Sequence, residues 1–193
     1  MISSYHINGL PLQTGDVLCT TNGKPDILPG EFWLLIGRLV PGEVDHVAVY
    51  VGPEGCCVEA GPCGVVSFLV PGEAWDAEKM VSQRGLIIDR LVGAAYPLEG
   101  RDLSKEDQAR IRQEVAAFCL AQVGKPYNIN FLDSHREDAF YCSQLVYCAY
   151  LHSGLNLNTG LAIETLPETS GIIYPQEIWS GCKHRQAVGT LIV

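Results

Sequence analysis

The feature that most constrains the fold is a run of β-branched and aromatic residues at positions 45–72, DHVAVYVGPEGCCVEAGPCGVVSFLVPG. Turn-forming Gly and Pro interrupt it at GPEG and at GPCG, which is the pattern of short strands joined by tight turns. Strands connected in this way pair antiparallel. The run therefore predicts a β meander.

Helical patterns are concentrated in the second half of the chain. The clearest is SKEDQARIRQEVAAFCLAQVGKPY, where Ser104 can cap a helix with Asp107 three residues on, and Gly124 and Pro126 end it. A further helix is expected at FYCSQLVYCAY, a short one at IIYPQEIWSG, and a closing strand at AVGTLIV.

Two elements are expected before the meander, a first strand at TGDVLCT and a short amphipathic helix over Phe32–Leu39. Strands that come first and helices that follow indicate an α+β fold rather than an alternating parallel sheet. The length of 193 residues fits a single domain, 1–193, in which 72–103 is a possible insert.

The composition excludes some partners. A net charge of −9 argues against nucleic acid and against an anionic membrane surface. The N-terminus MISSYHINGLPLQTGD has no basic segment followed by an apolar one, so we expect no signal peptide and a cytoplasmic location. The longest apolar runs, such as FWLLIG, are too short for a transmembrane segment.

Eight cysteines do not form a recognisable metal or disulfide pattern. No C-x-x-C spacing occurs, and Cys56, Cys57 and Cys63 have no matching Cys/His pair elsewhere. Cys142 and Cys148 point in different directions around a helix, so they should not bridge each other. We therefore expect no metal site. Free cysteines in proteins are most often small buried core residues, which is the default interpretation for each of these.

The GPEG hairpin brings one histidine close to one carboxylate. If Pro53 and Glu54 are the two turn residues, Gly52 faces Gly55 and paired residue numbers add up to 107. His46 and Glu59 are then diagonal neighbours on one face of the hairpin, unless a bulge changes the register. A carboxylate beside an imidazole is what a general base needs. Taken alone, the pair fits an ordinary satisfied polar pair at a sheet end better than a catalytic one.

Cys142 is the nucleophile candidate that this pair would serve. Asp138 is a plausible cap for the helix that follows, which places Cys142 in the first turn, where the helix dipole favours a thiolate. Cys148 lies mid-helix and has no such advantage. A thiol at a helix N-terminus, a histidine and an orienting carboxylate are the parts of a cysteine acyl-transfer enzyme.

TGDVL, DHVAVYVG, VEAG, GKPYN and FYCSQLVYCAY, in that order, resemble the permuted NlpC-type papain-like family of YiiX/YaeF-like proteins. The resemblance is weakest over 71–103. It implies a circularly permuted papain-like α+β fold, an antiparallel sheet or half-barrel packed against helices. It also implies Cys142 as nucleophile, His46 as base and Glu59 as the orienting member, with Tyr127 near the substrate or oxyanion site and Asp16 in a structural role. Neither a metal nor an organic cofactor is implied.

The resemblance predicts a cysteine hydrolase acting on an amide or ester, with a cell-wall-type peptide as the expected substrate. Acyl lipids are the alternative, because the same scaffold occurs in lipid acyltransferases. A non-catalytic binding module and a redox-sensing thiol protein are the rivals from other classes. Two departures from the family pattern are the missing export signal and Asp45, where relatives commonly have serine. His135 has neither an orienting partner nor a family counterpart.

Overall fold

The computed structural model describes residues 1–21, 42–85, 87–161 and 167–188. The bounds of its strands are β1 (Ser4–Ile7), β2 (Leu10–Gln13), β3 (Val17–Thr21), β4 (His46–Gly52), β5 (Cys56–Gly61), β6 (Gly64–Leu69), β7 (Arg90–Tyr96) and β8 (Lys183–Gln186). Those of its α-helices are α2 (Ala77–Arg84), α3 (Lys105–Ala121), α4 (Cys142–His152) and α5 (Pro175–Gly181).

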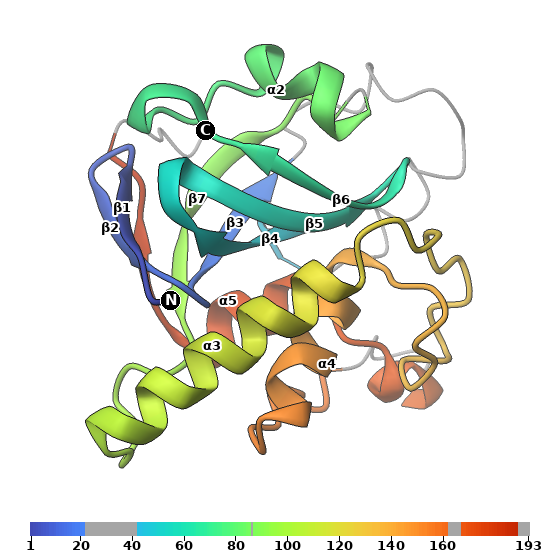
Figure 1. Cartoon of the computed structure of the whole chain (residues 1–193). Coiled ribbons are helices and arrows are strands. Elements are labelled where there is room, and N and C mark those ends of the chain that lie inside the picture. The colour runs from blue at the N-terminus through green and yellow to red at the C-terminus, as the bar shows by residue number, and fades with distance from the viewer. Residues whose placement is uncertain (22–41, 86, 162–166, 189–193) are drawn as a thin grey trace.

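Six strands form one antiparallel sheet in the order β6-β5-β4-β3-β7-β8, and β1 and β2 form a separate hairpin. Helices α3 and α4 lie on one side of the large sheet and α2 on the other (Figure 1). The predicted meander is present as β4, β5 and β6. The structure is therefore α+β with an antiparallel sheet, as the sequence predicts.

The sheet is buried on both faces because its strands alternate between two apolar cores. Val17, Val47 and Val49 belong to the core that packs against α3 and α4. Leu18, Ala48 and other neighbours of these residues belong to a second core, which includes the β1–β2 hairpin and Met80 of α2. This arrangement explains why the central strands read as continuous apolar runs.

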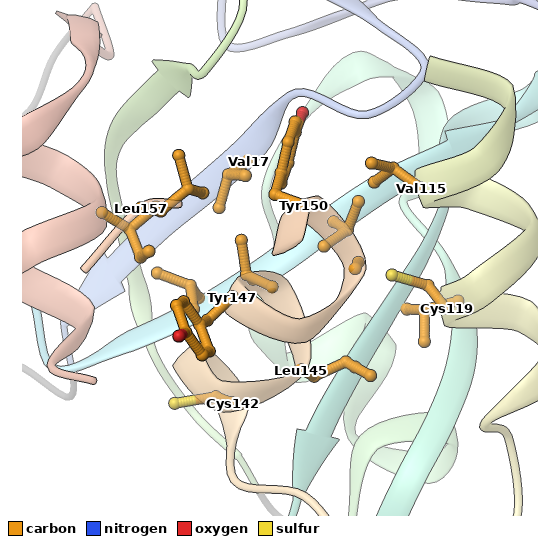
Figure 2. Close-up of a cluster of buried hydrophobic side chains, with 14 of the residues drawn as sticks. Val17, Val115, Cys119, Cys142, Leu145, Tyr147, Tyr150 and Leu157 are labelled. Atoms are coloured by element: carbon orange, nitrogen blue, oxygen red, sulfur yellow. The ribbon is translucent and has the colours of Figure 1, made fainter. Parts of the chain in front are cut away.

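In the first core, α4 is the central element. Figure 2 shows its Leu145 and Tyr150 packed between the sheet and α3, with Val115 and Cys119 of α3 alongside and Cys142 at the start of α4. Within the described residues, no helix is long and apolar enough to cross a membrane.

The long helix α3 is capped as predicted, because the Ser104 hydroxyl accepts a hydrogen bond from the amide of Asp107 at 3.0 Å. The predicted closing strand, residues 187–193, lies mostly outside the described residues. The strand β8 covers Lys183–Gln186, and just after it the amide of Ala187 donates to the carbonyl of Val92 in β7 at 2.9 Å. The expected helix Phe32–Leu39 lies outside the described residues.

The hairpin between β4 and β5 differs from the prediction at its turn only. Three residues, Pro53–Gly55, form the turn, and Gly52 pairs with Cys56 instead of facing Gly55. A register shift between Tyr50 and Gly52 compensates for the longer turn, so Val49 pairs with Val58. These two numbers add up to 107, as predicted for the body of the hairpin.

Candidate active site

His46 and Glu59 form a buried hydrogen-bonded pair. Nε2 of His46 lies 2.9 Å from Oε2 of Glu59. His46 is 8% exposed and Glu59 1% exposed. His46 is the first residue of β4 and Glu59 lies near the end of β5, so the pair is at the end of the hairpin away from its turn. The structure thus brings together the two side chains that the hairpin register predicts as neighbours.

Cys142 completes this arrangement from the other half of the chain. Its thiol shares a hydrogen bond with the His46 side chain. Since Nε2 of His46 is engaged by Glu59, Nδ1 is the ring nitrogen left for the thiol. The imidazole therefore lies between a carboxylate and a cysteine, which is the order of groups that a general base for a thiol requires.

Cys142 is the first residue of α4. The predicted cap is wrong: Tyr141 occupies the N-cap position, and Asp138 instead forms an ion pair with Arg136. The correction strengthens the argument from the helix dipole. The first N–H groups of a helix have no intrahelical acceptor, and together with the dipole they favour a negative charge at this position.

The chain on both sides of Cys142 is fixed by hydrogen bonds to one backbone position. The Tyr141 hydroxyl accepts from the amide of Ile173 at 3.0 Å, and the Ser143 hydroxyl donates to the carbonyl of Ile173 at 2.6 Å. Gln144 then accepts from the amide of Tyr141 at 3.2 Å. These contacts hold the start of α4 in one orientation, so the thiol position is determined by the fold.

Tyr127 lies beside the nucleophile candidate. Its backbone forms a bridge with Phe140, two residues before Cys142. Burial raises the pKa of the Tyr127 hydroxyl well above its ordinary value, and the neighbouring Cys142 adds to this effect. The hydroxyl is therefore neutral at physiological pH and able to donate a hydrogen bond.

The electrostatics of His46 favour its protonated form. Burial lowers the pKa of the imidazole, but the hydrogen bonds and charges of Cys142 and Glu59 outweigh burial and raise this pKa well above its usual value. An imidazolium between a thiolate and a carboxylate is the charge distribution expected of an activated cysteine.

Glu59 has a second partner that the sequence analysis missed. Arg84, the last residue of α2, is fully buried and donates from Nε to Oε1 of Glu59 at 2.9 Å and from Nη2 to Oε2 at 2.8 Å. The same guanidinium donates to Asp89 at 2.7 and 2.8 Å. Burial raises the pKa of Asp89, but Arg84 outweighs burial and the net shift is downward.

No signal in the sequence singles out Arg84. It lies in the segment where the family resemblance is weakest, and its neighbours AEKMVSQR read as a polar surface helix.

The other predicted residues lie elsewhere or have separate partners. Asp16 accepts hydrogen bonds from Arg112 and from the amide of Gln13, both at 2.8 Å, in a buried turn away from the cysteine. Asp45 accepts from the Thr21 hydroxyl at 3.4 Å. His135 is exposed.

Comparisons with known proteins give one family and one fold. The sequence matches the model of a family described as permuted papain-like amidase enzymes, YaeF/YiiX, over residues 12–169. The structure is similar to a crystal structure described as the metalloprotein YiiX from Escherichia coli O157:H7, with a TM-score of 0.50 and 16% sequence identity, over 90% of this chain and 94% of that chain. No curated protein matches the sequence.

These findings confirm the predicted fold, a permuted papain-like domain of α+β class. The structural neighbour is described as a metalloprotein. In the part of this chain that the structure describes, no group of three or more His, Cys, Asp or Glu side chains is arranged to hold a metal ion.

Proposed function

Because the chain belongs to the permuted papain-like amidase family of YaeF and YiiX, a class of cysteine hydrolases, we propose that it hydrolyses an amide by acyl transfer through Cys142. One observation carries the assignment to residues. His46 is hydrogen-bonded on one side to the buried carboxylate of Glu59 and on the other to a cysteine that begins a helix.

In the first half of the reaction, His46 accepts the thiol proton and the Cys142 sulfur attacks the carbonyl carbon. The tetrahedral intermediate carries its negative charge on the former carbonyl oxygen. The backbone N–H of Cys142 and the Tyr127 hydroxyl are the donors we assign to that oxygen. When the intermediate collapses, the C–N bond breaks, and His46 returns the proton to the leaving amine.

In the second half, water hydrolyses the thioester. His46 removes a proton from the water, whose oxygen attacks the acyl carbon, and the carboxylic acid leaves as the Cys142 thiol is regenerated. Glu59 stabilises the imidazolium in both halves and fixes the ring so that one nitrogen faces the reaction.

We assign a peptide-type amide as the substrate class, since the family is one of amidases. An acyl lipid is the second candidate, because the loop leading to the site exposes two apolar side chains, Ile129 at 70% and Leu132 at 64%. Ring contacts join this loop to the site: Phe131 lies 6.3 Å from the ring of Tyr127 and 5.3 Å from that of Tyr141. If the substrate is a peptide, replacing Ile129 and Leu132 with serine should leave its hydrolysis unchanged. If the substrate is an acyl lipid, the same replacement should reduce acyl-ester hydrolysis.

The test of the assignment does not need a substrate. The rate constant for alkylation of each cysteine by iodoacetamide is measured against pH by peptide mass spectrometry, in wild type and in His46→Ala. An ordinary thiol has a pKa of about 8.5, so at pH 6 about 0.3% of it is ionised. We expect Cys142 of the wild type to react about a hundredfold faster at pH 6 than this fraction allows, and His46→Ala to lose that advantage.

Two controls come from the chain itself. Cys148 lies in the same helix, and burial raises the pKa of its thiol to about 12, so it should remain unreacted over the whole range. His152→Ala removes an exposed histidine from the end of α4 and should leave the Cys142 profile unchanged. Identical Cys142 profiles in wild type and His46→Ala would refute the assignment and would favour a non-catalytic binding module.

A further inference from the structure

Glu59 is held from two directions, and the second of them involves residues that the family resemblance does not assign. Its Oε2 serves His46 at 2.9 Å and the Arg84 Nη2 at 2.8 Å, while Oε1 accepts from Nε of Arg84. The guanidinium therefore binds both carboxylate oxygens in the planar, bidentate geometry for which arginine is suited.

Arg84 is itself immobilised. Its second carboxylate partner, Asp89, receives hydrogen bonds from Nη1 and Nη2. The guanidinium carbon lies 4.8 Å from the ring centre of Phe68 and 4.7 Å from that of Trp75. The indole N–H of Trp75 also donates to Asp89 at 3.1 Å. A group with this many fixed contacts has little freedom to rotate, so it transmits a fixed orientation to Glu59.

Arg84 offsets part of the negative charge of this cluster. Glu59 and Asp89 bring two negative charges into a buried site, and the guanidinium is the cation that contacts both. Without it, two uncompensated carboxylates would lie near the His46 imidazole, which contacts the Cys142 thiol, and their field would oppose a further negative charge on that sulfur.

We propose that Arg84 is a positioning residue for the proposed reaction: it orients the Glu59 carboxylate on His46 and balances its charge, with Asp89, Phe68 and Trp75 holding the guanidinium in place. The inference rests on the proposed roles of Cys142, His46 and Glu59. Arg84 touches neither substrate nor the reacting sulfur, and its effect passes through Glu59.

The test uses the same alkylation profile of Cys142, which requires no substrate. Arg84→Lys keeps the charge but loses the bidentate hydrogen bonds to Glu59. We expect it to lower the Cys142 alkylation rate at pH 6 about tenfold, with little movement of the acidic limb of the pH–rate profile. Arg84→Gln loses the charge as well, and we expect the acidic limb to move up by about one pH unit.

Arg112→Gln is the matched control. It disrupts another buried arginine–aspartate pair, with Asp16 at 2.8 Å, and should cost comparable stability without moving the Cys142 profile. A merely structural role for Arg84 predicts that the variants at both positions behave alike. If Arg84→Gln does not fold, Arg84→Lys alone still decides the outcome.

A double-mutant cycle tests whether Arg84 acts through Glu59. In a Glu59→Gln background, Arg84→Lys should change the rate less than twofold, because the oriented carboxylate is already gone. An equal loss in both backgrounds, or a wild-type profile in Arg84→Lys, would overturn the inference. His46→Ala, measured in the same series, separates the two failures. If it matches wild type, the proposed function fails, whereas if it alone loses reactivity, only the role of Arg84 fails.

Discussion

Replacement of Arg112 by methionine is expected to destabilise the protein by an amount that the contacts of this residue allow us to estimate. Arg112 projects from α3, and its Nη1 donates to Oδ1 of Asp16 and to the carbonyl of Thr14, both at 2.8 Å. Both members of the ion pair are buried, with exposures of 8% and 2%. The contacts join α3 to the turn that leads into β3.

Methionine fills a similar volume but leaves Asp16 as an uncompensated buried carboxylate. Removing one partner of a buried pair costs about 3–5 kcal/mol. We expect a value near the lower end, about 3 kcal/mol, because Oδ2 of Asp16 keeps its hydrogen bond from the amide of Gln13 at 2.8 Å. With a urea dependence of about 2 kcal/mol per molar, the unfolding midpoint at pH 7.5 should fall by about 1.5 M.

The cost should depend on pH in a defined direction. Burial raises the pKa of Asp16 even in the wild type, with Arg112 opposing that effect, so loss of Arg112 raises this pKa further. A raised carboxyl pKa gives stability that is complete below the unfolded-state value of about 3.9 and is lost as pH rises through the folded-state value. The free-energy difference between wild type and Arg112→Met should therefore be smaller at pH 5 than at pH 7.5.

Urea unfolding followed by circular dichroism at both pH values measures this difference. Adding Asp16→Asn to the variant should recover part of the loss, because asparagine still accepts from the Gln13 amide without a charge. A loss below about 1 kcal/mol that is equal at both pH values would refute the reasoning, since it would mean that water compensates the Asp16 carboxylate.

Two further substitutions test individual hydrogen bonds. Tyr150→Phe removes the buried hydroxyl that donates to the Gly15 carbonyl at 2.7 Å, and should lower the free energy of unfolding by about 1 kcal/mol in the same urea assay. Ser104→Ala removes the cap that accepts from the Asp107 amide, and should lower the Tm by about 3 °C in a thermal melt. No loss in Ser104→Ala would mean that the start of α3 does not need its side-chain cap.

Much of the fold follows from signals that act over a few residues. The cap of α3 was predictable because Ser104 and Asp107 are three positions apart, and the meander because its turns are marked by Gly and Pro. The neighbourhood of His46 and Glu59 was predictable for a similar reason. Residues on one face of a hairpin are fixed by register alone. The turn itself was predicted one residue too short, and the bulge in β4 restored the register.

The meeting of Cys142 with His46 required the whole fold. They belong to the two halves of the chain, and their contact depends on how α4 packs against the sheet, which no local pattern specifies. The family resemblance supplied this contact as an expectation. The cap of α4 shows the limit of local reasoning in another way: Asp138 is a good capping residue, yet it pairs with Arg136, and the helix begins later.

Arg84 shows why a buried cation escapes sequence analysis. An arginine at the end of a polar helix is expected to be solvated. Only the folded structure shows that this side chain is buried and donates to Glu59. Burial of a guanidinium is costly unless its donors are satisfied, and here four of its five N–H donors bond to two carboxylates while the group lies between two aromatic rings. Each of these partners comes from a different segment. A site of this kind becomes visible only when those segments are seen together, so a segment with weak family resemblance can still hold residues that orient the reacting groups.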